Sequence, residues 1–82
     1  MDRYSEEARE LYNKIIDAAL EAQKKGHYVS VELCNYGFDI YVTAKRRGLI
    51  ARAPLTLCEG ASFKNHDFAE RCQGLIEDLE AL

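Results

Sequence analysis

The sequence predicts a small α+β domain in the order αβββα, in which both helices pack on one face of a three-stranded antiparallel meander. Three observations lead to this prediction. Apolar residues recur at helical spacing towards both ends of the chain, they alternate with polar residues in the middle, and turn signals separate the alternating runs. A chain of 82 residues, of which 48% are hydrophobic and 30% charged, has the size and composition of one globular domain covering residues 1–82.

The first helix is expected to run from Ser5 to Lys25. Ser5 can cap its first turn, where Glu6 and Glu7 suit the positive end of the helix dipole, and Gly26 can end it in the left-handed conformation. The apolar positions at helical spacing are Tyr4, Ala8, Leu11, Tyr12, Ile15, Ile16, Ala18, Ala19, Leu20 and Ala22. They cover nearly half of the circumference, so we expect this helix to contact both the sheet and the second helix.

The middle of the chain predicts a β-hairpin. Polar and apolar residues alternate over residues 27–34 and again over residues 38–45, and Asn35-Tyr36-Gly37 between them is a turn signal. One face of the hairpin is apolar throughout if the loop has two or four residues, and not if it has three. The expected cross-strand neighbours are Val29 with Ala44, Val31 with Val42 and Leu33 with Ile40 on that face, and Glu32 with Tyr41 on the other.

A third strand is expected after a tight turn at Arg47-Gly48. The residues that would continue the apolar face are Leu49, Ala51, Ala53 and Leu55, with Ile50 and Arg52 on the opposite face. Pro54 lacks an amide hydrogen, which fits an edge strand. We expect residues 57–63 to form a loop, and a short fourth strand at residues 55–58 is the alternative.

The last helix is expected from His66 to Leu82, with Asn65 or Asp67 as its capping residue. Its narrow apolar stripe consists of Phe68, Cys72, Leu75, Ile76, Leu79 and Leu82. Because Cys72 lies within this stripe, it should be the most protected of the three cysteines.

The composition favours a cytoplasmic protein that has no membrane partner. The first residues are charged where a secretory leader would be apolar, and no apolar run approaches the length of a membrane span. The cysteines, Cys34, Cys58 and Cys72, are odd in number, which favours free thiols in a reducing compartment. The paired spacing typical of zinc sites is missing, so we expect no metal and no cofactor.

The sheet face opposite the helices is the expected binding surface for another protein. Tyrosine and arginine are enriched where proteins dock, and this face would carry both. The candidate partner-binding residues are Tyr28, Glu32, Tyr41, Thr43, Ile50 and Arg52. An ordinary solvated sheet face is the alternative. In size and layout, such a non-enzymatic protein is similar to small accessory proteins and inhibitors of phages and mobile elements.

The first strand also predicts a homodimer. In a meander the strand at residues 27–34 forms one edge of the sheet, and it contains no proline and only one charged residue, Glu32. Natural edge strands are usually protected by charge, proline or a bulge. Two-fold pairing of first strands would make a continuous six-stranded sheet.

Nucleic-acid binding is the second hypothesis. The basic residues that could contact phosphates are Lys45, Arg46, Arg47 and Arg52. The order αβββα is that of double-stranded RNA-binding domains, which contact RNA through a Gly-Pro-x-His loop and a lysine cluster that opens the second helix. Here the loop is Asn35-Tyr36-Gly37-Phe38 and the helix opens with Asn65-His66-Asp67-Phe68, so the likeness is limited to element order. The net charge of −3 also argues against a nucleic-acid partner.

A small enzyme is the third hypothesis. Cys58 and His66 lie near acidic residues in one predicted loop, as a nucleophile and a base would. We expect no enzyme, because no phosphate loop or telling carboxylate pair accompanies them.

Overall fold

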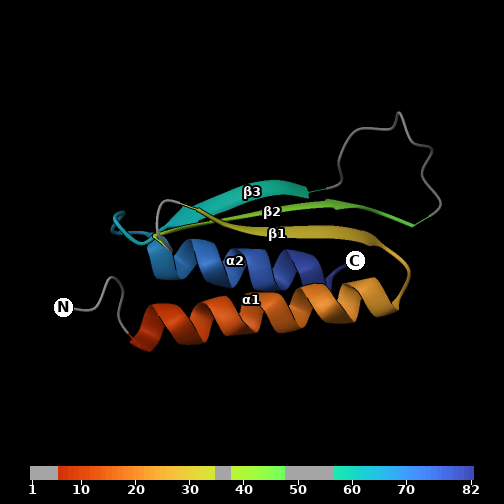
Figure 1. Ribbon diagram of the computed structural model, residues 1–82, viewed down its shortest axis with the longest axis horizontal. Coiled ribbons are helices and arrows are strands. Elements are labelled where there is room, and N and C mark those ends of the chain that lie inside the picture. The colour runs from red at the N-terminus through yellow and green to blue at the C-terminus, as the bar shows by residue number, and fades with distance from the viewer. Residues whose placement is uncertain (1–5, 35–37, 48–56) are drawn as a thin grey trace.

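The computed structural model describes residues 6–34, 38–47 and 57–82, and it has the predicted αβββα architecture. The elements are α1 (Glu6–Lys24), β1 (Tyr28–Cys34), β2 (Asp39–Lys45), β3 (Leu57–Ser62) and α2 (Phe68–Glu80). The three strands form one antiparallel sheet in the order β1-β2-β3. Both helices cover the same face of this sheet and leave the other face open (Figure 1). Helix α1 packs against β1 and α2, and α2 packs against β3.

The hairpin register is the predicted one. Val31 pairs with Val42, Leu33 with Ile40, and Glu32 with Tyr41. The last pair before the connection joins Cys34 to Asp39, which corresponds to the four-residue loop rather than the two-residue loop. The turn signal itself, Asn35-Tyr36-Gly37, lies outside the described residues.

The predicted position of the third strand is wrong. The strand that pairs with β2 is β3, so residues 57–62 form a strand where we expected a loop. The expected strand at residues 49–55, including Pro54, lies outside the described residues. Glu59 concealed the true strand, because it interrupts the apolar alternation between Leu57 and Ala61.

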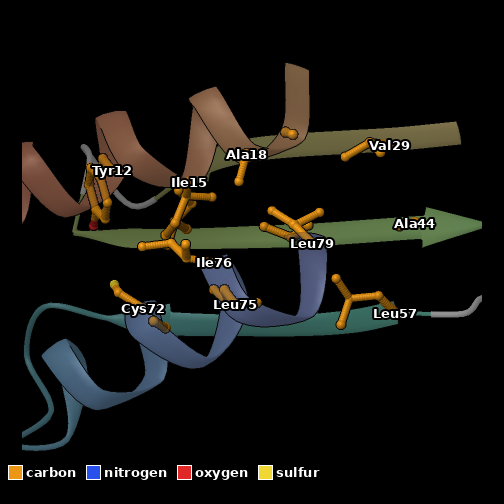
Figure 2. Close-up of a cluster of buried hydrophobic side chains, with 14 of the residues drawn as sticks. Tyr12, Ile15, Ala18, Val29, Ala44, Leu57, Cys72, Leu75, Ile76 and Leu79 are labelled. Carbon is orange, nitrogen blue, oxygen red and sulfur yellow. The ribbon is translucent and has the colours of Figure 1, made fainter. Parts of the chain in front are cut away.

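The core lies between the two helices and the sheet. Figure 2 shows Ile15 of α1 and Leu79 of α2 over β2, the central strand, and both side chains are fully buried. The buried residues are Ala8, Tyr12, Ile15, Ala18, Ala19, Ala22, Val29, Ile40, Val42, Ala44, Leu57, Ala61, Phe68, Cys72, Leu75, Ile76 and Leu79. This core confirms the predicted apolar faces of both helices except at Leu20, which was expected on the apolar face of the first helix but is 53% exposed. Burial raises the pKa of the Cys72 thiol to about 11.

The helix ends agree with the sequence in part. Gly26 follows α1 with a φ of +94°, the left-handed conformation that we expected there. Ser5 and Tyr4 lie outside the described residues. Asp67 is the residue at the N-cap of α2, but its side chain caps nothing. Instead, its carboxylate accepts a 2.8 Å hydrogen bond from Nε of Arg71, one turn into the helix. Within the described ranges, no helix combines the length and apolarity that crossing a membrane requires.

Candidate functional site

The open face of the sheet brings together the predicted partner-binding residues that the structure describes. Tyr28 and Tyr41 have 59% and 51% of their surface exposed, and Glu32 and Tyr41 lie side by side on neighbouring strands. Thr43, on the same strand as Tyr41, is half-buried. Ile50 and Arg52 lie outside the described residues. The result is a polar face with two exposed tyrosines that neither helix covers (Figure 1).

Tyr41 is held in place by the strand beside it. Its ring lies over Gly60, where a Cβ atom would come within 2.6 Å of Cδ1 of the tyrosine. Glycine therefore permits the aromatic ring to rest on the backbone of β3. Tyr41 is thus directed towards β3, whereas Tyr28 lies at the start of β1, on the opposite edge.

Among residues 6–34, 38–47 and 57–82, no strand pairs with the outer edge of β1. Next to the end of β3, the amide of Phe63 donates a 2.7 Å hydrogen bond to the carbonyl of Phe38. In an antiparallel ladder, bonded and non-bonded pairs alternate, so even-numbered residues of β2 bond to β3 and odd-numbered residues bond to β1. It follows that the N–H and C=O groups of Val29, Val31 and Leu33 point away from β2, towards the free edge.

A side-chain contact agrees with this assignment. Nε2 of Gln23 donates a 3.1 Å hydrogen bond to the carbonyl oxygen of Val29, which it could not reach easily if that oxygen pointed at β2. Gln23 thus satisfies one outward acceptor. The N–H and C=O groups of Val31 and Leu33 also point outwards, and no partner for them occurs among the described residues.

Aliphatic side chains accompany these backbone groups. Leu33 faces the helix side of the sheet, as predicted, but 51% of its surface is exposed, and Val31 is only half-buried. Leu20 is 53% exposed and precedes Gln23 by three residues, so it lies on the same flank of α1, one turn earlier. The β1 edge, defined here as Val29, Val31, Leu33 and Leu20, therefore combines free backbone groups with exposed aliphatic surface.

One acceptor lies unpaired near the end of this edge. Oδ1 of Asp39 is buried and has no hydrogen-bond donor in the part of the chain that the structure describes. Its cross-strand neighbour is Cys34, on the open face. Partial burial, and then the charges of Glu32 and Asp39, raise the pKa of the Cys34 thiol.

The β3 edge has different chemistry. Glu59 lies opposite the buried Val42 and therefore on the helix side of the sheet, where it meets Asp78 of α2. A hydrogen bond to Asp78, partial burial and the charge of Asp78 raise the pKa of Glu59, and Arg71 opposes this shift. Both carboxyl groups line a hollow of about 380 Å³. Glu59 is exposed, and a charged side chain on an edge strand is one of the devices that protect it from pairing.

The predicted basic cluster is divided by the structure. Arg47 packs its side chain on Gly26 and donates a 3.2 Å hydrogen bond to the carbonyl of Lys25. Its amide donates to Nδ1 of His27 at 2.8 Å. Arg46 instead lines the hollow that contains Glu59 and Asp78, and Lys45 ends β2 next to Tyr28. Arg52 lies outside the described residues.

The residues proposed for catalysis are also separated. Cys58 lines the hollow that contains Glu59 and Asp78, whereas His66 lines another, next to Phe63 and Phe68. They lie towards opposite ends of β3, because Cys58 is its second residue and His66 comes four residues after Ser62, its last. Among residues 6–34, 38–47 and 57–82, no three or more histidine, cysteine, aspartate or glutamate side chains are grouped so that they could hold a metal ion.

Comparison with protein-family models, with curated proteins and with solved structures gave no match. Sequence reasoning identified the β1 strand as an exposed edge, but it missed the Glu59–Asp78 pair and the buried Asp39 oxygen. The only sequence signal for Glu59 was a charge at an apolar position of the alternation.

Proposed function

We propose that this protein acts by binding an extended segment of another polypeptide along the β1 edge. The observation that supports this most strongly is the outward direction of the backbone groups of Val31 and Leu33, next to the half-exposed side chain of Leu33. Adding a strand to such an edge is a common mode of peptide recognition, in which main-chain hydrogen bonds supply affinity and alternate side chains supply specificity.

The chemistry of the edge defines the segment that it would bind. The partner must be extended, and every second side chain must be apolar in order to lie beside Val31 and Leu33 on the helix side. Each new hydrogen bond is worth about 1 kcal/mol. Taking an exposed leucine side chain from half to full burial adds about 1.5 kcal/mol. Tyr28 lies on the open face of β1 beside Lys45, so it would border the bound segment.

A site-specific photo-crosslinker tests this proposal in cells that express the protein. Benzoylphenylalanine replaces Leu33 on the edge in one variant and Glu77, which is exposed on α2, in the control. We expect a discrete crosslinked polypeptide from position 33 only. Adding Val31→Pro should abolish it, since proline removes an outward N–H but no bond to β2. Equal crosslinking from both positions, or crosslinking that survives Val31→Pro, would refute the proposal.

A further inference from the structure

The β1 strand is complementary to itself when reversed. Its apolar and polar residues alternate regularly, and its single charged residue, Glu32, lies beside its middle residue, Val31. Three of the four large hydrophobic side chains that are exposed among the described residues, Leu20, Tyr28 and Leu33, lie on this strand or on the flank of α1 beside it. A second copy of the chain would therefore present to this edge the extended, alternating segment that the proposed function requires.

Only one two-fold register suits the sequence. An axis at Val31 pairs all seven residues of β1, with Leu33 beside Val29 and Ser30 beside Glu32 of the second copy. The carbonyl oxygen of Val29 already accepts from Gln23, and its second lone pair can accept from the amide of Leu33. An axis at Glu32 would place two carboxylates directly opposite each other, which is unfavourable. An axis at Ser30 would place Leu33 beside His27, whose ring is already bonded to the amide of Arg47 and to the main-chain oxygen of Leu82.

The register at Val31 also brings a donor towards the carboxyl group of Asp39, one oxygen of which, Oδ1, is buried without a hydrogen-bond donor among the described residues. It places Tyr28 of one copy beside Cys34 of the other, on the open face. Asp39 is the next residue in the same row, two strand spacings or roughly 9.5 Å from Tyr28. Tyrosine and aspartate side chains together span this distance, and the small Cys34 lies between them. Tyr28 is 59% exposed in the single chain, so its hydroxyl group is available.

From these observations, and on the basis of the proposed function, we infer that the segment bound at the β1 edge is β1 of a second copy, paired about a two-fold axis at Val31, with the hydroxyl of Tyr28 donating to Asp39 of the second copy. Two such contacts form in each dimer. The dimer has one six-stranded sheet, with all four helices on one face and the tyrosines on the other.

Sedimentation equilibrium on the full chain tests this assembly. We expect a reversible dimer of twice the 9.3 kDa chain mass. Tyr28→Phe removes only the donor hydroxyl and should raise the dissociation constant at least about tenfold. Glu77→Gln, which changes an exposed polar side chain on α2 away from the β1 edge, should leave it unchanged. Asp39→Asn should be non-additive with Tyr28→Phe, because the two residues form one contact.

The register has its own test, an engineered disulfide. On the β1–β1 junction the even-numbered residues form the non-hydrogen-bonded pairs, whose Cα atoms are about 4.5 Å apart, within the range for a disulfide. In a Cys58→Ser background, Tyr28→Cys should therefore form a covalent dimer through the native Cys34 on mild oxidation. Thr43→Cys, on the same face of the central strand, should form none.

The outcomes separate the inference from the function on which it rests. A monomer at all concentrations, an unchanged dissociation constant for Tyr28→Phe, or no disulfide between positions 28 and 34 would overturn the inference. If position 33 then crosslinks to a polypeptide whose mass differs from that of this chain, the β1 edge is still a binding edge, but its occupant is another protein. If position 33 crosslinks to nothing, the proposed function is wrong as well.

Discussion

The two edges of the sheet expose their backbones in the same way but differ in the side chains that accompany them. At the β1 edge, Val31 and Leu33 carry outward backbone groups beside exposed aliphatic surface. At the β3 edge, the exposed Glu59 lies beside Asp78 on the helix side of the sheet, and the residues with outward backbone groups are small ones such as Gly60. The comparison teaches that protection from strand pairing is local: this chain accepts a repulsive carboxyl pair at one edge and leaves the other edge open.

Proline substitutions should show the largest effect, because they separate inward from outward amides on β1. Glu32→Pro removes a hydrogen bond to β2 and should lower the free energy of unfolding by about 3 kcal/mol. Val31→Pro removes only an outward N–H and part of a half-buried side chain, and should cost about 1 kcal/mol. Urea denaturation measures both losses of unfolding free energy, at a protein concentration low enough to favour the single chain. Equal losses would show that the assignment of outward residues is wrong.

Removing the charge of Glu59 at the β3 edge should have an intermediate effect on stability. Glu59→Val ends the repulsion with Asp78 and restores the apolar alternation of β3, so the single chain should become more stable by about 1 kcal/mol. The same change should make the β3 edge able to pair, and light scattering should detect assemblies larger than those of the unchanged protein. Glu59→Gln is the matched control, since it removes the charge but stays polar. Unchanged assembly of Glu59→Val would show that Glu59 does not protect this edge.

The smallest expected effect is on the pH dependence of the free energy of unfolding. Because the pKa of Glu59 is raised in the folded protein, the protonated carboxyl stabilises the fold below its ordinary pKa, and this contribution is lost as the pH rises through the raised value. Asp78→Asn removes the main cause of the shift. It should stabilise the protein by a few tenths of a kcal/mol at neutral pH, and should flatten the pH dependence in that interval. An unfolding free energy that varies with pH equally in both proteins would contradict this.

Most of the fold could be predicted from the sequence because it depends on local periodicity. The register of β1 and β2 follows from the demand that Val31 and Val42 share one apolar face. The third strand could not be placed, because Glu59 interrupts the pattern of β3, and its reason for doing so is a contact with α2.

The candidate site was predictable to a smaller extent. Sequence showed that the first strand is an edge without protective residues, and the exposed Tyr28 and Tyr41 are where we expected them. Which amides point outwards depends on the hydrogen-bond phase of the whole sheet, which side-chain patterns do not encode. The division of the basic residues, with Arg47 tied to Lys25, likewise depends on tertiary contacts.

Amide hydrogen exchange along β1, followed by NMR at increasing protein concentration, tests the central claim most directly. In dilute solution, the amides of Ser30 and Glu32 should exchange slowly because they bond to β2, while those of Val31 and Leu33 should exchange fast. As the concentration rises and the edge becomes occupied, Val31 and Leu33 should become protected, and the amides at the β3 edge should not. Protection of the Val31 and Leu33 amides already in the dilute protein would contradict the account. So would fast exchange of these amides at every protein concentration, if it persists when the polypeptide identified by crosslinking from position 33 is added.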